Sequence, residues 1–559
     1  MLVSEAVGAA LAELGTDTVF GVVGSGNFHV TNALIARGAR FIAARHECGA
    51  ASMADGWART AGRPGVLSLH QGPGLTNALT GITEAAKSRT PMVVLAADVA
   101  ASAVRSNFRI DVAAIATAIG AVPARLHSAG FAVDDAVRAY RTAADERRTV
   151  LLALPLDVQA ESCPPPAVRA EAAAGRPDLA ADVPGGAGVA GEAVFALADA
   201  LVRARRPVFI AGRGARIAGA RADLEALADV CGALLATSAA AKGLFRGNPW
   251  DLDVSGGFAS PLAAELIRGA DLVIGWGSTL NMWTLRHGKL ISPGTVVAQV
   301  DSDPAQLGAH RPVEVAVTGD VAETARAVIG LLADGRPQQA AGYRSAELRE
   351  RLARQIRWRD VPFADESDGQ TVDPRALTIA LDDLLPGQRT VAVDSGNFMG
   401  YPSMYLSVPD ANGFCFTQAY QSVGLGLGSA IGAAVARPDR LTVAALGDGG
   451  ALMGISELET AVRLGLPMLI VIYDDEAYGA EVHHFGPDGH PLGTVTFPPT
   501  DIAEIARGFG CQGLSVRSVA DLGPVRSWLD DPGDQPLVID AKISSAHGSW
   551  WLEEAFRGH

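Results

Sequence analysis

Two aspartates in the last third of the chain are the residues best placed to do chemistry. Asp448 lies in the glycine-rich turn 447–450, directly after an apolar run, and Asp475 follows the next apolar run. The carboxyl ends of parallel strands meet at one edge of a sheet, so a strand–helix–strand unit would bring the two carboxylates together. Two carboxylates, a backbone carbonyl and phosphate oxygens form the hard oxygen site that Mg²⁺ prefers, and glycines let backbone N–H groups approach phosphates closely. The pattern therefore predicts a diphosphate held through a metal ion.

The segment 441–479 resembles the signature of thiamin-diphosphate enzymes, which opens with Gly-Asp-Gly and ends in an Asn-Asn or Asn-Asp pair. Asp474 stands where that family usually has Asn, and Asp475 falls on the ligand position proper. The resemblance implies that Asp448, Asp475 and the backbone of Ala477 hold Mg²⁺. It also implies that the cofactor diphosphate lies against the turn glycines, which are Gly447, Gly449 and Gly450.

A second match lies in residues 44–98, which resemble the pyrimidine-binding domain of the acetohydroxyacid synthase, pyruvate oxidase and benzoylformate decarboxylase superfamily. Glu47, in a His-Glu element, matches the activating acid of that family. Residues 72–77 match its Gly-Pro-Gly-x-Thr-Asn element, including the cofactor-site residue Asn77. A carboxylic acid that is hydrogen-bonded to the cofactor's aminopyrimidine favours the imino tautomer, whose nitrogen can take the proton from thiamin C2. The resemblance therefore implies thiamin diphosphate activated by Glu47.

Further cofactor contacts are implied by the same resemblance. Val423 matches the bulky apolar residue that holds thiamin in its bent conformation, and the backbone carbonyl of Gln421 would accept from the 4′-amino group. Asn397 falls where relatives place a diphosphate donor. In this family the cofactor lies between two chains, so Glu47 and Asp448 would come from different subunits of a homodimer or homotetramer.

The elements that must position these residues are visible as apolar runs that alternate with Ala-rich helical patterns. This alternation predicts βαβ units and an α/β fold with three doubly wound parallel-sheet domains. The expected bounds are 1–160 for the pyrimidine-binding domain, 190–335 for the central domain and 370–545 for the diphosphate-binding domain. Residues 159–190 are interpreted as a linker, and residues 340–368 as a charged, helical connector. The expected strands are 18–23, 65–69, 92–96, 150–154, 270–278, 295–304, 390–393, 441–446, 468–473 and 536–539, with a strand, a glycine turn and a helix start in 207–219.

The residues that would meet the substrate are less sharply defined. His70 and Gln71 precede the Gly-Pro-Gly turn, at the point that faces the cofactor in relatives. Benzoylformate decarboxylase has a catalytic His at the place of His70 and a Ser that matches Ser25. Its second His, from the middle domain, has only a rough counterpart in His287. His70 could also be a satisfied histidine at a helix start.

A polar roof over the substrate is expected from the helix that follows the acidic pair. Glu481 and His484 are its titratable candidates, and one of His483 and His484 is expected to be solvated because helix neighbours point to different faces. This roof and the Gly-Pro-Gly-x-Thr-Asn phrase favour ligation, whereas His70 favours simple protonation. The sequence thus predicts an acetolactate-synthase-like enzyme that decarboxylates a 2-oxo acid and transfers the acyl carbanion equivalent to a carbonyl acceptor. The alternatives are a 2-oxo acid decarboxylase of the benzoylformate decarboxylase type and, less favoured, a non-catalytic regulatory homologue.

The chain departs from the acetohydroxyacid synthases at two elements, one in their active site and one in their FAD site. Their Phe-Gln-Glu active-site element reads Phe-Arg-Ile at 108–110, and their flavin element is replaced by residues 278–283. FAD, which the synthases carry structurally, is therefore doubtful. The glycine turn 212–214 leaves a nucleotide site open, although so short a motif is more often a plain strand–helix turn.

Composition excludes several other classes of protein. The chain has 559 residues with 46 Lys and Arg against 61 Asp and Glu, a net charge of −15 that disfavours nucleic-acid binding. Its 48% hydrophobic and 19% charged residues suit large cores and not disorder. The five cysteines are scattered, which argues against a disulfide framework or zinc site and for a cytoplasmic location. The N-terminal segment is expected to be a first helix and not a signal peptide, and no apolar run is long enough to cross a membrane.

Overall fold

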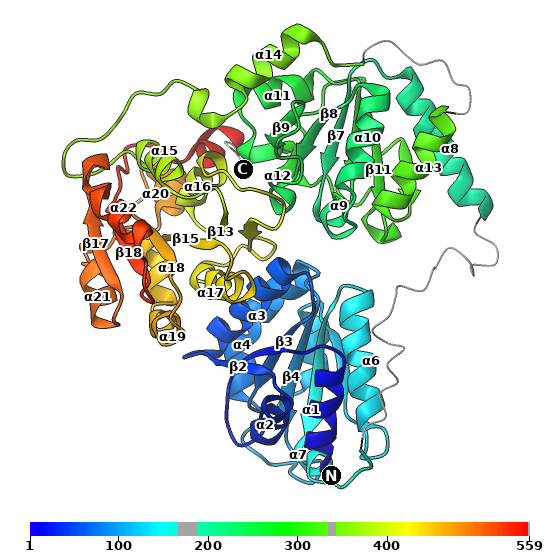
Figure 1. Cartoon of the computed structure of the whole chain (residues 1–559), viewed down its shortest axis with the longest axis vertical. Coiled ribbons are helices and arrows are strands. Elements are labelled where there is room, and N and C mark those ends of the chain that lie inside the picture. The colour runs from blue at the N-terminus through cyan, green and yellow to red at the C-terminus, as the bar shows by residue number, and fades with distance from the viewer. Residues whose placement is uncertain (166–186, 334–341, 557–559) are drawn as a thin grey trace.

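The computed structural model describes residues 1–165, 187–333 and 342–556 and contains three six-stranded parallel sheets (Figure 1). The predicted fold class, three α/β domains with doubly wound parallel sheets, is confirmed. The N-terminal domain lies at the bottom of Figure 1, the central domain at the upper right and the C-terminal domain at the upper left. The predicted linker falls mostly outside the described residues.

The N-terminal sheet has the order β2-β1-β3-β4-β6-β5. Its interior strands are mostly apolar and are buried at nearly every position, as expected for strands that are covered on both faces. Its strands are β1 (Thr18–Val22), β2 (Arg40–Ala43), β3 (Gly65–Leu69), β4 (Met92–Asp98), β5 (Val122–Arg125) and β6 (Thr149–Pro155). Its helices are α1 (Val3–Glu13), α2 (Phe28–Ala36), α3 (Glu47–Ala61), α4 (Pro73–Lys87), α5 (Val112–Ala118), α6 (Ala132–Asp145) and α7 (Leu156–Gln159).

The central sheet has the order β12-β11-β10-β7-β8-β9. The chain starts in the middle at β7, adds β8 and β9 on one side and then β10, β11 and β12 on the other. Its strands are β7 (Pro207–Ala211), β8 (Leu234–Thr237), β9 (Asp251–Val254), β10 (Leu272–Trp276), β11 (Val296–Asp301) and β12 (Val315–Thr318). Its helices are α8 (Ala187–Arg203), α9 (Arg213–Ile217), α10 (Arg221–Cys231), α11 (Pro261–Arg268), α12 (Met282–Leu285) and α13 (Val321–Ala333), and α14 (Ala346–Gln355) lies in the predicted connector.

The C-terminal sheet, β14-β13-β15-β16-β18-β17, repeats the strand order of the N-terminal sheet. Its strands are β13 (Arg389–Val393), β14 (Phe414–Phe416), β15 (Leu441–Gly447), β16 (Leu469–Asp474), β17 (Gln512–Val516) and β18 (Leu537–Lys542). Its helices are α15 (Pro374–Leu384), α16 (Gly400–Tyr405), α17 (Gly426–Ala436), α18 (Asp448–Met453), α19 (Glu457–Arg463), α20 (Gly479–Phe485), α21 (Ile502–Gly508) and α22 (Gly523–Asp530).

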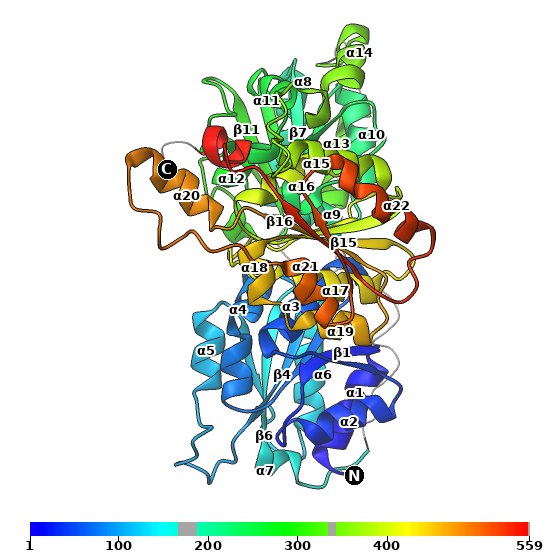
Figure 2. The same ribbon diagram turned by 90° about the vertical axis from the view of Figure 1, so that its left-hand side faces the viewer.

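One hydrophobic core runs from the N-terminal sheet to the C-terminal sheet through the helices between them. Helices α3 and α17 cross at its centre (Figure 2). Glycines make the crossing close, because a Cβ at Gly56 would overlap the backbone oxygen of Ser429, and one at Gly432 would overlap that of Met53. The N-terminal and C-terminal domains are therefore packed as one unit, with the starts of α3 and α4 on one side of it.

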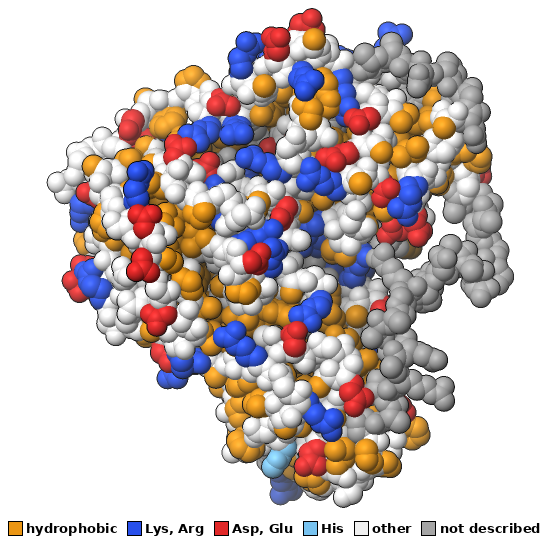
Figure 3. All heavy atoms as spheres, viewed as in Figure 1, with side chains coloured by type: hydrophobic (Ala, Val, Ile, Leu, Met, Phe, Trp, Pro, Cys, Tyr) orange, Lys and Arg blue, Asp and Glu red, His pale blue; other side chains and the backbone are white. Residues whose placement is uncertain are grey.

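The surface and the cysteines agree with the expectations from composition. Acidic and basic side chains are interspersed over the face seen in Figure 3. All five cysteines are free thiols. Within the described residues, no helix is both long and apolar enough to cross a bilayer.

Candidate active site

The two predicted metal-binding aspartates lie together at the carboxyl edge of the C-terminal sheet. Asp448 is the first residue of α18, Asp475 directly follows β16, and β15 and β16 are paired neighbours. Burial, followed by the charges of Asp475 and Asp474, raises the pKa of Asp448 to about 8. Burial and the charge of Asp474 raise the pKa of Asp475 to about 7. A buried and a half-buried carboxylate with raised pKa values form a place where a cation would be stabilised.

No group of three or more His, Cys, Asp and Glu side chains in the described ranges could hold a metal ion. A metal at Asp448 and Asp475 would thus draw its other ligands from backbone carbonyls and ligand oxygens. Ala477, the predicted backbone ligand, lies in the same loop, which an isolated β-bridge ties to Thr496. This donor set, all oxygen, fits Mg²⁺ better than a soft metal.

The turn glycines are required by close packing. A Cβ at Gly450 would overlap the Asp394 carboxylate, and one at Gly449 would lie 2.7 Å from the Tyr478 ring. Gly447 has the Phe398 ring 3.0 Å from the position of a Cβ. Side chains larger than hydrogen therefore do not fit at these three positions, and the bare backbone of the turn is left for close contact with a ligand.

A buried ion network lies beside the loop 474–477 that carries Asp475. Lys542, at the end of β18, forms an ion pair with Asp474 and lies 3.2 Å from the Asp540 carboxylate. Its ammonium also donates to the backbone oxygen of Thr500 at 2.9 Å. Asp474 in turn accepts from the backbone N–H of Glu476 at 3.0 Å. The acidic residue at the usual Asn position is therefore charge-compensated by a lysine that the sequence pattern did not single out.

Asp394, at the end of β13, fixes the turn that carries Val423. It is fully buried and accepts from the backbone N–H of Gly424 at 3.0 Å and of Leu425 at 3.3 Å. Burial raises its pKa to about 6. The Val423 side chain lies 3.1 Å from where a Cβ on Gly450 would be, so Val423 and the glycine turn 447–450 are adjacent. Sequence reasoning missed Asp394, although its place after a strand is the same signal that identified Asp448.

Gln421 adopts a left-handed backbone conformation, with φ +60°. This conformation is uncommon for a residue with a side chain and is maintained by surrounding contacts. The Ser395 hydroxyl donates to the Gln421 carbonyl at 3.5 Å. The carbonyl that is predicted to meet the 4′-amino group is therefore part of a constrained turn.

Asn397 is buried with its amide oxygen already occupied. The backbone N–H of Ser549 donates to Asn397 Oδ1 at 2.8 Å, and the Trp551 indole donates to its backbone oxygen at 3.0 Å. These contacts fix the side chain with its Nδ2 group as the remaining donor. A donor is what the predicted diphosphate contact requires.

The structure brings Glu47 and Asn77 together. Glu47 is the first residue of α3, and Asn77, on α4, donates to Glu47 Oε2 at 3.1 Å. Gly74 lies beside them, since a Cβ there would be 3.9 Å from Glu47 Oε1. Among the described residues of the single chain, no hydrogen bond or ion pair joins Glu47 to Asp448 or Asp475.

His70 lies next to this acid in a defined tautomer. The backbone N–H of Gly26 donates to His70 Nδ1 at 3.2 Å, so a neutral ring carries its proton on Nε2. Burial lowers the pKa of His70, and the charge of Glu47 opposes that change. The ring meets Phe108 edge-on with centroids 5.4 Å apart. His70 is therefore a neutral N–H donor beside Glu47.

The neighbours of His70 differ in exposure. Ser25 is exposed in the same turn as Gly26. Gln71 is buried beside Gly26 and Ala97, and its Oε1 has no hydrogen-bond partner in the part of the chain described. Gln71 thus lies within the N-terminal domain, where it supports the turn.

Helix α20 presents the two predicted roof residues to solvent in the single chain. Glu481 and His484 are exposed, whereas His483 packs against Gly548 and burial lowers its pKa. The solvated member of the histidine pair is therefore His484. His287 lies elsewhere, on the interdomain cleft, with its ring 5.1 Å from Phe556.

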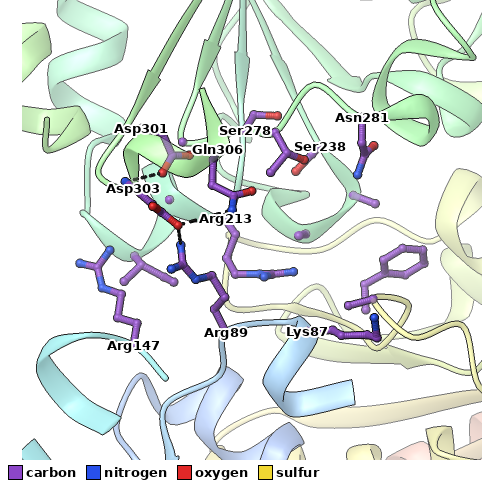
Figure 4. A pocket seen from close by; sticks show the side chains of 18 of the residues that line it. Lys87, Arg89, Arg147, Arg213, Ser238, Ser278, Asn281, Asp301, Asp303 and Gln306 are labelled. Carbon is purple, nitrogen blue, oxygen red and sulfur yellow. Dashed lines mark hydrogen bonds and ion pairs between the residues drawn. The ribbon is translucent and has the colours of Figure 1, made fainter. Parts of the chain in front are cut away.

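That cleft, of about 2600 Å³, lies between the three domains (Figure 4). An ion pair of 2.9 Å between Arg89 and Asp303 crosses it. The glycine turn 212–214 borders it, but the N–H of Gly214 donates to Gly277 and Arg213 donates to the backbone of Ser88. The turn therefore serves packing between loops and domains, and the N–H groups of both its glycines are already bonded to backbone oxygens, Gly212 to Trp276 and Gly214 to Gly277.

Comparison with known proteins gives a consistent picture. Residues 1–115 match the model of the N-terminal TPP binding domain of thiamine pyrophosphate enzymes, residues 194–328 that of the central domain, and residues 394–541 that of the C-terminal TPP binding domain. The "Probable 2-ketoarginine decarboxylase AruI" of Pseudomonas aeruginosa is 32% identical over 92% of this chain and 88% of its own length.

Two other comparisons cover nearly the whole chain. Acetolactate synthase isozyme 2 large subunit of Escherichia coli is 27% identical over 97% of this chain and 96% of its own. The structure of a thiamine diphosphate-dependent 4-hydroxybenzoylformate decarboxylase of Rhodococcus jostii RHA1 superposes with a TM-score of 0.79 at 22% identity, covering 97% of this chain and 99% of that chain, which shows a shared fold. With three domain models matched in order and a relative 32% identical along nearly its full length, the chain belongs to the thiamine pyrophosphate enzyme family.

Proposed function

We propose that this enzyme decarboxylates a 2-oxo acid with thiamin diphosphate and Mg²⁺ and then protonates the product, so that an aldehyde is released. The observation that carries the proposal is the neutral His70, which has Nε2–H as its donor beside Glu47. When bound, the cofactor supplies the carbanion and the electron sink. Among the relatives, a protein named as a 2-ketoarginine decarboxylase supports this choice.

Mg²⁺ is proposed at Asp448, Asp475 and the Ala477 carbonyl. The residues fit, because both carboxylates have raised pKa values and a divalent cation would relieve the repulsion that the Asp475 charge exerts on Asp448. Asn397, Val423, the Gln421 carbonyl and the glycines of the 447–450 turn complete the proposed cofactor site.

Lys542→Met is expected to weaken Mg²⁺-dependent retention of thiamin diphosphate by about 10- to 100-fold, as for other outer partners of metal ligands. The change leaves the buried Asp474 carboxylate unpaired, which destabilises the loop that carries Asp475 and so displaces a proposed metal ligand. Adding Asp474→Asn in the same chain should restore most of the affinity, because it removes that charge. Calorimetric titration of the wild type, both single variants and the double variant checks this. Equal affinity of Lys542→Met and the wild type would contradict it.

Ligation to a carbonyl acceptor is the second candidate. It is favoured by the polar side chains of Glu481 and His484 on α20, which would orient an acceptor where an apolar roof would not. The acetolactate synthase among the relatives is consistent with it. The two candidates share decarboxylation and differ only in whether a proton or a carbonyl carbon receives the electron pair.

His70→Phe is expected to slow aldehyde release by about 10²-fold, the lower range for loss of a positioned acid–base group, and to leave cofactor affinity unchanged. The test incubates protein, thiamin diphosphate and Mg²⁺ with a panel of 2-oxo acids that includes pyruvate, an aryl and a guanidino acid, with and without excess aldehyde. Mass spectrometry identifies the products. A wild type that forms mainly a 2-hydroxyketone or acetohydroxy acid would overturn the decarboxylase proposal. In that case His484→Phe should shift products towards free aldehyde.

We also propose an active site shared by two copies of the chain in a homodimer or homotetramer. Tyr420, Met453 and Tyr478, beside the proposed cofactor residues, are exposed large hydrophobic side chains that a second copy would cover. The domain bounds 1–160, 190–335 and 370–545, and a cytoplasmic location, remain predictions. FAD is not favoured, since the N–H groups of Gly212 and Gly214 in the 212–214 turn are already bonded, and the absorbance spectrum of the purified protein tests for it.

A further inference from the structure

Two buried glutamates make hydrogen bonds between the N-terminal and C-terminal domains in opposite directions. Glu84, on α4, and Glu457, on α19, are 1% and 2% exposed. Each accepts hydrogen bonds from two consecutive backbone N–H groups of the other domain. Bonds from an N–H to a carboxylate are roughly twice as strong as neutral ones, so each contact fixes a peptide segment firmly.

Glu457 holds the segment that leads into the activating acid. Its carboxylate accepts from the N–H of Arg45 at 3.1 Å and of His46 at 3.0 Å. The Thr460 hydroxyl donates to its other oxygen at 2.7 Å. A Cβ at Gly49 would overlap Glu457 Oε1, so this glycine leaves room for the carboxylate. The peptide immediately before Glu47 is therefore anchored to the C-terminal domain.

Glu84 holds the segment that leads into Gln421. Its carboxylate accepts from the N–H of Ala419 at 3.2 Å and of Tyr420 at 2.7 Å. Arg59 donates to the same carboxylate at 2.8 Å and to the backbone oxygen of Phe416 at 2.9 Å. Residues of the N-terminal domain thus hydrogen-bond the backbone of the segment just before Gln421 at three residues, which are Phe416, Ala419 and Tyr420.

From this symmetry we propose that Glu457 and Glu84 are reciprocal positioning residues for the cofactor's aminopyrimidine. Glu457 sets the position of the Glu47 carboxyl, and Glu84 sets the direction of the Gln421 carbonyl. The inference rests on the proposed function, since it assigns Glu47 and Gln421 to that ring. If the site is shared between two copies, one N-terminal domain orients Glu47 for one cofactor and Gln421 for the other.

The geometry gives the two glutamates different sensitivities to substitution. In Glu457→Gln the amide oxygen can take the place of Oε1, which receives both backbone N–H groups, and only the second contact of the Arg45 N–H, to Oε2 at 3.2 Å, is lost. In Glu84→Gln one amide oxygen cannot replace both acceptors, because Ala419 and Arg59 donate to Oε1 while Tyr420 donates to Oε2. Glu457→Leu removes both acceptors at similar volume.

The test measures H/D exchange at C2 of the bound cofactor per mole bound, together with calorimetric cofactor affinity and the melting temperature. We expect Glu457→Leu and Glu84→Gln to slow exchange by about tenfold or more, since displacements near 1 Å can cost up to about 10²-fold. Glu84→Gln should also weaken cofactor affinity, whereas Glu457→Gln should exchange within about twofold of the wild type, because the one acceptor that both N–H groups share is kept.

Lys242→Met is the matched control. Lys242 is buried and donates to the Ser403 backbone oxygen at 2.7 Å, from the central to the C-terminal domain. Its ammonium lies 5.8 Å from the centroid of the Phe414 ring and bonds neither glutamate nor residues 419–421. The substitution should lower the melting temperature without changing exchange. If Glu457→Leu and Glu84→Gln behave like this control, the two glutamates are only structural and the inference is wrong. If the wild type itself does not accelerate exchange over free cofactor, the proposed function fails instead. Glu84→Gln and Glu457→Gln keep the question decidable should Glu457→Leu not fold.

Discussion

Asp448→Asn is expected to abolish Mg²⁺-dependent retention of thiamin diphosphate. The substitution keeps the shape of a side chain that is 7% exposed and removes one of two anionic ligands proposed for the metal. Changes to outer partners of metal ligands cost about 10- to 100-fold in affinity, so loss of a ligand itself should cost more than about 100-fold. Calorimetric titration of the apo protein with cofactor and Mg²⁺ measures the loss.

Asp301→Asn is the matched control for this variant. Asp301 ends β11 of the central sheet as Asp448 follows β15 of the C-terminal sheet, and burial raises its pKa as well. Its replacement should leave cofactor affinity unchanged. Equal affinities of the wild type and Asp448→Asn would remove Asp448 from the metal site.

The raised pKa values of the acidic pair give this prediction a pH dependence. A carboxyl whose folded pKa lies above its unfolded value favours folding at low pH, and that contribution is lost as pH rises through the folded pKa. The apo protein should therefore lose stability between about pH 4 and pH 8 through Asp448 and Asp475. Mg²⁺ needs both groups ionised, so its affinity should rise over the same range. In Asp448→Asn the melting temperature of the apo protein should depend less on pH.

The sequence revealed the interior strands except β8 and missed the edges of all three sheets. Interior strands such as β3 and β10 are buried at every position and therefore read as continuous apolar runs. Edge strands such as β5 and β12 alternate between partly buried and exposed positions and are only four residues long. Their pairing depends on the neighbouring strand, so a local pattern does not identify them.

The site shows a similar division. Glu47, His70 and Asp448 could be found because each lies in a short motif whose chemistry is local. Glu84 and Glu457 act on backbone N–H groups of another domain, and no spacing in the sequence links a residue to a partner hundreds of positions away. One tertiary partner did leave a signal, because an Asp at position 474 in place of Asn requires a buried cation nearby, which Lys542 supplies.

Glu47→Gln is expected to slow C2–H/D exchange of the bound cofactor by about 10²-fold or more, the usual contribution of a positioned acid–base group. Glutamine keeps the size of the side chain and can still accept from Asn77, but it has no acid proton to share with the aminopyrimidine. Cofactor affinity and oligomeric state should change little, because the metal and diphosphate contacts lie in the other domain. Exchange is measured by NMR after acid quench, and affinity by calorimetry.

Asn77→Ala separates the acid itself from its support. Asn77 donates to Glu47 Oε2 at 3.1 Å, so its loss frees the carboxyl to move without removing it. Exchange should fall by less than in Glu47→Gln, and the double variant should exchange no more slowly than Glu47→Gln alone, because Asn77 would act only through the acid. If Glu47→Gln exchanged at the wild-type rate, activation would belong to another group. If the exchange rate of the double variant fell by the product of the two single-variant losses, Asn77 would instead contact the cofactor directly.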